Sequence, residues 1–127
     1  KKIAIIGGGA SGLVAAIAAA RTNPQAQILI YEKKDKAGKK ILATGNGRCN
    51  LTNKDMNASY FHSDNLSVVE EVLQKFGYED TIAFFTSLGL LTKQEEITSI
   101  LFDQASTVLD LLKSELDRLH VKITTDV

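Results

Sequence analysis

Residues 3–32 read IAIIGGGASGLVAAIAAARTNPQAQILIYE, and this stretch decides the fold. It begins with an apolar run stopped by glycine, a pattern typical of a strand that is buried on both faces of a parallel sheet. Residues 11–22 are mostly small or aliphatic, with apolar side chains at helical spacing, and Asn23-Pro24 ends the helix. Residues 28–31 form a second apolar run. The stretch therefore predicts a βαβ unit whose two strands are parallel neighbours.

The turn between the first strand and the helix carries the motif G-x-G-x-x-G, formed by Gly7, Gly9 and Gly12. Gly7 allows the tight turn, Gly9 lets the backbone approach a diphosphate, and Gly12 lets the helix pack closely on the sheet. The free amides at the helix start then bind the anion. Glu32 follows the second strand, at the motif's spacing of about 20 residues, where a carboxylate accepts hydrogen bonds from a ribose 2′-hydroxyl. This context predicts binding of FAD or NAD rather than NADP; the plain alternative is a glycine-rich turn that binds nothing.

The composition is that of an ordinary soluble domain. The 127 residues include 15 basic and 15 acidic side chains, so no global charge attracts nucleic acid or an anionic membrane. The length allows one domain, residues 1–127, but is short for a complete flavin enzyme, so a fragment is expected. A secretory leader is disfavoured because glycines interrupt the first apolar stretch, and no segment reaches the ~20 apolar residues that cross a bilayer. One cysteine, Cys49, agrees with a reducing cytoplasm.

The middle of the chain predicts a lysine-rich loop and then three helices. Residues 33–57 are interpreted as a long structured loop that carries function, or as a solvated basic linker. Asn65 and Asp103 are expected to cap the first and third helices, and Gly77 and Gly89 to end the first and second. The predicted core faces are Leu66, Val69, Val72, Leu73 and Phe76, then Ile82, Phe85 and Leu88, and finally Ala105, Val108, Leu109, Leu112, Leu116 and Leu119. Residues 97–102 are ambiguous between a strand and an extended connection, and residues 121–124 predict a strand. The fold class is therefore α/β and Rossmann-like, with a three-helix excursion.

Residues 38–53, which read GKKILATGNGRCNLTN, narrow the range of ligands that the chain is expected to bind. Two glycines flank Asn46, so the backbone there can adopt conformations that bring it close to a ligand. Arg48 offers a cationic fork for phosphate or ring oxygens, and the asparagines and threonines offer neutral donors and acceptors. An Asn-Gly turn with a surface arginine remains the plainer interpretation.

With these motifs, the chain resembles the bacterial flavoproteins of the aminoacetone oxidase and bile-acid reductase group, which combine a G-G-G-A-x-G turn with a G-K-K-I-L-x-T-G-N-G-R-C-N-x-T-N loop. The resemblance runs over residues 3–53 and 104–127 and favours FAD over NAD. It implies that the following residues lie along FAD: Ala10, Ser11, Lys33, Lys40, Thr44, Gly47, Arg48, Cys49 and Asn50, with the backbone of Val127 bordering the adenine. It also implies a longer protein, with a substrate domain and a C-terminal return. The family's G-R-x-F-P segment is absent here, since residues 96–102 read EITSILF.

The resulting hypothesis is a cytoplasmic FAD-dependent oxidoreductase that acts on a small organic substrate, with this chain supplying the ADP-binding part. The alternatives are an NAD-dependent dehydrogenase, a non-catalytic nucleotide-binding module, and a flavoprotein acting on RNA, which the neutral charge disfavours. Cys49 is interpreted as a small buried residue rather than a redox thiol, because it has no CxxC partner. His62 and His120 lack partners at ligand spacing, so no metal site is predicted. The sequence assigns no catalytic acid or base, substrate or oligomeric state.

Overall fold

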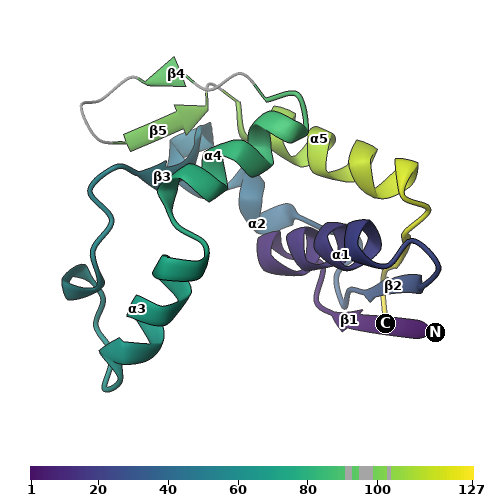
Figure 1. Cartoon of the computed structure of the whole chain (residues 1–127). Helices are drawn as coiled ribbons and strands as arrows, with labels where there is room; N and C mark the ends of the chain where they lie inside the picture. Colours follow the sequence, from purple (N-terminus) through teal and green to yellow (C-terminus); the bar gives the residue numbers. More distant parts are fainter. Residues whose placement is uncertain (91–92, 95–98, 103) are drawn as a thin grey trace. The chain divides into compact units, whose positions relative to one another are not determined.

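The computed structural model describes residues 1–90, 93–94, 99–102 and 104–127. The chain divides into two compact units (Figure 1). The first unit comprises Lys1–Cys49 and Gln104–Val127, and the second unit comprises Asn50–Asp103. Each unit has its own small sheet.

The first unit is built on a parallel sheet with the strand order β1-β2-β6. Its elements are β1 (Lys2–Ile6), α1 (Ala10–Thr22), β2 (Gln27–Tyr31), α2 (Lys39–Leu42), the 3₁₀ turn η1 (Thr44–Gly47), α5 (Ala105–Arg118) and β6 (Lys122–Thr124). Ile5 of β1 lies opposite Ile30 of β2, which in turn lies opposite Ile123 of β6. The predicted βαβ unit and the predicted C-terminal strand are therefore confirmed, with the strands parallel.

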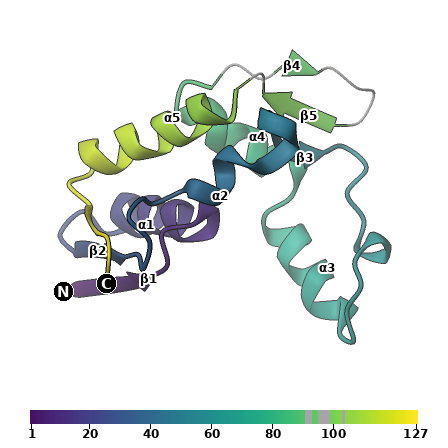
Figure 2. The ribbon, with the colours of Figure 1, turned by 180° about the vertical axis from the view of Figure 1, so that it is seen from behind.

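Helix α1 lies between the β1–β2 pair and α5, as Figure 1 and Figure 2 both show. Its small and aliphatic residues allow this close packing, and Leu13, Ala16 and Ile17 are completely buried. The predicted core face of α5 is buried over Ala105 to Leu116, while Leu119 is half-buried. Helical spacing of apolar residues therefore identified the faces that form the core of this unit.

Strand β1 differs from the prediction, because the first unit buries it on one face only. Ile3 and Ile5 are half-buried on the side that α1 covers, whereas Ile6 is 83% exposed. β1 is an edge strand that pairs with β2 in the part of the chain the structure describes. An apolar run shows that a strand tolerates burial on both faces, but it does not show which segments provide that burial.

The second unit contains a small sheet in the order β3-β5-β4, with β4 and β5 antiparallel. Its elements are β3 (Cys49–Asn53, beginning at the last residue of the first unit), the 3₁₀ turn η2 (Ala58–Tyr60), α3 (Leu66–Lys75), α4 (Tyr78–Ser87), β4 (Lys93–Gln94) and β5 (Ser99–Phe102). β3 corrects the prediction of a long loop over residues 33–57. Its sequence, CNLTN, lacks the apolar alternation from which strands are recognised.

The helices of the second unit begin and end close to the predicted positions, but α3 does not form core. Val72 is 57% exposed and Phe76 is 48% exposed, and no residue of α3 is buried. Asn65 precedes α3 without capping it, because its Oδ1 accepts from the Ser67 hydroxyl instead. Ile82, Phe84 and Phe85 of α4 are half-buried, and the φ of +89° at Gly89 confirms the predicted stop. Asp103 lies outside the described residues.

An ion-pair cluster joins α1 to α5 at their carboxyl ends. The Glu115 carboxylate accepts from Arg118 Nε at 2.7 Å and from Arg21 Nη2 at 2.8 Å, and its side chain is only 11% exposed. The hydrogen bond from Arg118, together with Arg21, lowers the pKa of Glu115 to about 2. Glu115 is therefore expected to stabilise the fold in its ionised form.

Replacing Glu115 with glutamine is expected to lower the free energy of unfolding at pH 7 by about 1–2 kcal/mol, because charged hydrogen bonds to two arginines are lost. The folded pKa lies below the ordinary value of 4.5, so this difference should persist above pH 4.5 and decline as the pH falls toward about 2. Urea denaturation at several pH values measures it. Glu71→Gln, which removes an exposed pair with Lys75, is the control and should change little. A difference that grows with acidification would contradict this assignment.

Candidate functional site

The glycine turn has the geometry that a strand-to-helix connection requires. Gly7 has a φ of +99°, and its N–H donates to the carbonyl oxygen of Tyr31 at 2.8 Å, which fixes the turn to β2. A Cβ on Gly12 would lie 1.9 Å from the carbonyl oxygen of Gly7. Glycine at positions 7 and 12 is therefore explained by the fold itself.

Gly9 has no comparable internal reason to be glycine. Its φ of −78° and ψ of −175° are extended and suit any residue, and apart from its two chain neighbours no heavy atom of the described chain lies within 4 Å of the Cβ position. It immediately precedes α1, whose first amides are capped by no side chain of the described residues, and Ala10 and Ser11 are exposed. Open space in front of uncapped amides suits an anionic group that approaches the backbone.

The Glu32 carboxylate lies at this turn. Its Oε2 accepts from the N–H of Gly8 at 2.7 Å, and its Oε1 accepts from the N–H of Lys34 at 2.9 Å. The hydrogen bonds from Lys34 and then Gly8 lower the pKa of Glu32, so the carboxylate is ionised at neutral pH. Because a carboxylate has about four lone-pair positions, both oxygens remain able to accept from sugar hydroxyls.

A hollow of about 150 Å³ connects the glycine turn, Glu32 and the start of α2. It is lined by Gly8, Gly9, Glu32, Lys34, Lys36, Gly38, Lys39 and Lys40. Lys39 is paired with Asp35 at 2.5 Å. Of these residues, Gly9, Glu32 and Lys40 were predicted site residues. The lysine run was visible in the sequence, but only the folded loop shows which of its side chains surround the hollow.

The Asn-Gly loop after α2 has the unusual backbone that its glycines predict. Gly45, Asn46 and Gly47 all have positive φ values, of 57°, 54° and 87°. The Thr44 hydroxyl donates to the Ile41 carbonyl oxygen at 2.6 Å, which fixes the start of η1. Four further predicted site residues are exposed, one next to Glu32 and three in or beside the Asn-Gly loop: Lys33, Thr44, Gly47 and Arg48. Asn50 is the first residue of the second unit.

Cys49 is a buried thiol at the end of the first unit. Burial raises its pKa, and a hydrogen bond with Thr44 acts in the opposite direction. A thiol with a raised pKa is protonated at neutral pH and is a poor nucleophile. This agrees with the interpretation of Cys49 as a small buried residue.

The C-terminal end of the chain also reaches Glu32. The Val127 N–H donates to the Glu32 carbonyl oxygen at 3.3 Å, and the Asp126 N–H donates to the Lys34 carbonyl oxygen at 3.1 Å. The structure therefore brings the glycine turn, the acidic residue and the Val127 backbone to one edge of the first unit. Contact between a bound cofactor and each of the predicted site residues stays a prediction.

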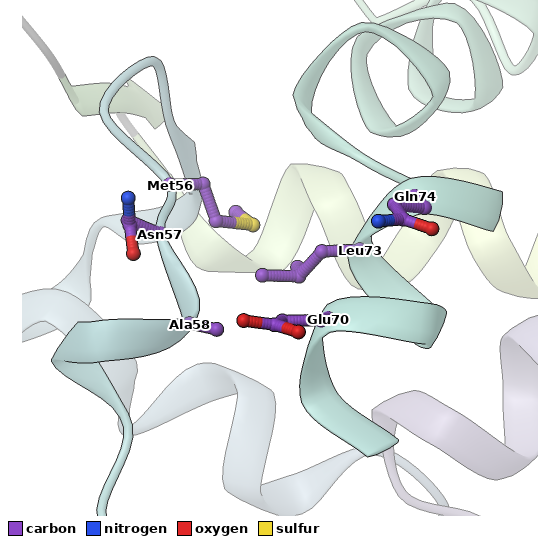
Figure 3. Close-up of a pocket in the computed structure, with 6 residues that line it drawn as sticks. All are labelled: Met56, Asn57, Ala58, Glu70, Leu73 and Gln74. Carbon is purple, nitrogen blue, oxygen red and sulfur yellow. The ribbon is translucent and has the colours of Figure 1, made fainter. Parts of the chain in front are cut away.

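The second unit has a separate hollow of about 360 Å³, shown in Figure 3. The side chains of Met56 and Leu73 point toward each other across it, and Glu70 of α3 lies near Ala58. It contains no residue of the predicted site. Among the described residues, no group of three or more His, Cys, Asp or Glu side chains could hold a metal ion. None of the helices in the described ranges combines the length and the hydropathy of a membrane-spanning segment.

The parallel β1-α1-β2 unit, the glycine turn and the acidic residue after β2 define a Rossmann-like nucleotide-binding domain. The chain belongs to the family described as "HI0933-like protein Rossmann domain", whose model matches residues 1–127. The crystal structure of Thermovibrio ammonificans THI4 has the same fold, with a TM-score of 0.62 at 17% identity over 98% of this chain and 38% of that chain.

Two curated relatives are similar in sequence. A 3-dehydro-bile acid delta(4,6)-reductase from Clostridium scindens is 55% identical over 99% of this chain. A ribosomal RNA dihydrouridine synthase from Haemophilus influenzae is 31% identical over 94% of it. The chain spans 31% and 29% of the lengths of these relatives. One of these relatives is thus named as a reductase, and each matches nearly the whole of this chain with less than a third of its own length.

Proposed function

We propose that this chain supplies the ADP-binding part of an FAD site in a flavin-dependent oxidoreductase. The observation that carries the proposal is the open space at Gly9, in front of the uncapped amides of α1 and beside the hydrogen-bonded Glu32 carboxylate. Diphosphate oxygens would accept from the amides at the start of α1, and Glu32 would accept from a ribose hydroxyl.

FAD is preferred to NAD because of the extended loop over residues 38–53. This loop carries the flavoprotein-like motif, and its start at Gly38, Lys39 and Lys40 lines the same hollow as Gly9 and Glu32. Lys39 is paired with Asp35, but Lys34, Lys36 and Lys40 also line the hollow and add positive charge where a dinucleotide brings negative charge. Bound flavin supplies hydride exchange with an organic molecule, while the residues of this chain bind and orient its ADP half.

The substrate is proposed to be a small organic molecule, and the single cysteine suits an enzyme of the cytoplasm. The relative at 55% identity is named for reduction of a bile acid, whereas the relative at 31% is named for ribosomal RNA. The higher identity and the zero net charge of this chain favour the small molecule over RNA.

Purification of the intact protein tests the cofactor. We expect a yellow sample with a flavin absorption spectrum that releases FAD on denaturation. A colourless protein that binds NAD would instead support a dehydrogenase, and one that binds neither would overturn the proposal. Assays with an unsaturated bile-acid ketone and with ribosomal RNA as alternative substrates then separate the two substrate classes.

Replacing Glu32 with alanine is expected to weaken FAD binding by about tenfold or more, because a hydrogen bond to a charged group is lost. Because the pKa of Glu32 is lowered, its contribution should be complete above the ordinary value of 4.5 and disappear as the pH falls through the lowered value. Calorimetric titration of the intact apoprotein at pH 7 measures the change. Glu71→Ala, at an exposed carboxylate of the second unit, is the matched control. Equal affinities in both variants would remove Glu32 from the site.

A further inference from the structure

Gly8 is the middle glycine of the turn and occupies an unspecified position of the G-x-G-x-x-G motif. It is buried, and its φ is not positive, so its backbone conformation does not demand glycine. Space does. A Cβ at this position would lie 2.9 Å from the Cβ of Ala37 and 3.2 Å from both Cβ and Oε2 of Glu32. A side chain there would displace the residues that form the site.

Both backbone polar groups of Gly8 are bonded to the same neighbouring segment. Its N–H donates to Glu32 Oε2 at 2.7 Å, and its carbonyl oxygen accepts from the N–H of Gly38 at 2.7 Å. These bonds attach Glu32 and the lysine loop, which we define as residues 33–40, to the glycine turn.

The other side of the lysine loop is held by α5. Gly38 has a φ of +77°, and a Cβ on it would lie 2.2 Å from Cδ1 of Leu109. The loop therefore packs between Gly8 and Leu109, with Ala37 only 4% exposed. Because close-packed contacts leave no room for an added methyl group, a change at Gly8 would be transmitted to the carboxylate and to the loop together.

From these contacts we infer that Gly8 is a positioning residue, which holds the Glu32 carboxylate and the lysine loop in the arrangement that recognises the ribose of the cofactor. This inference rests on the proposed function. It assigns Gly8 a role distinct from that of Gly9, since Gly9 leaves room for the ligand and Gly8 leaves room for the residues that bind it.

Four forms of the intact apoprotein test the inference: wild type, Gly8→Ala, Ala37→Gly, and the double variant. Calorimetric titration with ADP and with 2′-deoxy-ADP gives the preference for the ribose hydroxyl. We expect wild type to prefer ADP by about tenfold, the value of one hydrogen bond to a charged group. Gly8→Ala should reduce this preference to about twofold or less. A general loss of folding would weaken both ligands alike and leave the preference unchanged.

The double variant provides the rescue, because Ala37→Gly removes the atom closest to the added methyl group. Its preference for ADP should return to within about threefold of that of Ala37→Gly alone. An unchanged preference in Gly8→Ala, or no recovery in the double variant, would overturn the role of Gly8 while leaving the FAD proposal intact. If the wild-type protein binds neither FAD nor ADP, the proposed function is overturned, and this inference with it.

Discussion

Replacing Gly9 with valine is expected to weaken FAD binding severely while leaving the fold intact. The extended backbone of Gly9 accommodates a β-branched residue, and no described atom beyond its chain neighbours lies within 4 Å of its Cβ position. The branched side chain would instead stand in front of the amides of Ala10 and Ser11. Losing two hydrogen bonds to charged phosphate oxygens, at about 1.5–3 kcal/mol each, should weaken binding by about a hundredfold or more.

Calorimetric titration with FAD and thermal unfolding of the apoprotein measure the two effects of Gly9→Val separately. The melting temperature should stay within about 2 °C of wild type, which corresponds to a small change in stability. Gly9→Ala is a graded control that should impair binding less. Undiminished FAD affinity in Gly9→Val would show that the cofactor does not approach the backbone at this turn.

Replacing Gly12 with alanine is expected to cause a large loss of stability, whereas Gly9→Val should leave stability nearly unchanged. The added Cβ would lie 1.9 Å from the carbonyl oxygen of Gly7, a backbone atom that is fixed by the turn between β1 and α1. Relieving this overlap requires α1 to move away from the sheet, at a cost of about 3 kcal/mol or more.

Urea denaturation measures the loss, and Gly9→Ala makes the same chemical change three positions earlier in the chain. Because that Cβ meets no described atom beyond its chain neighbours, the effect of Gly9→Ala on stability should be within about 1 kcal/mol. Similar stabilities for Gly12→Ala and Gly9→Ala would contradict the packing explanation. Within one motif, Gly12 is therefore expected to be required for folding and Gly9 for cofactor binding.

The sequence predicted the parts of the fold that depend on local pattern. The β1-α1-β2 unit, the core face of α5 and the stop at Gly89 follow from periodicity and from glycine placement. The glycine turn and Glu32 were predicted for the same reason, since their spacing along the chain is fixed by the length of one helix and one strand. Each of these features is specified within about 30 neighbouring residues.

Other features depend on contacts that no local pattern contains. The apolar stripe of α3 predicted core, but amphipathicity does not identify the segment that covers a face, and Val72 and Phe76 are exposed. Strand β3 is recognised by its pairing rather than by its composition. Gly8 was assigned no role, because its significance depends on Ala37 and Gly38, which the fold of the lysine loop brings against it.

A crystal structure of the intact protein with bound ADP tests the nucleotide site most directly. We expect the diphosphate within hydrogen-bonding distance of the amides at the start of α1, next to Gly9, and a ribose hydroxyl donating to the Glu32 carboxylate. Diphosphate bound away from the glycine turn, or ribose out of reach of Glu32, would contradict the assignment of this turn as the cofactor site.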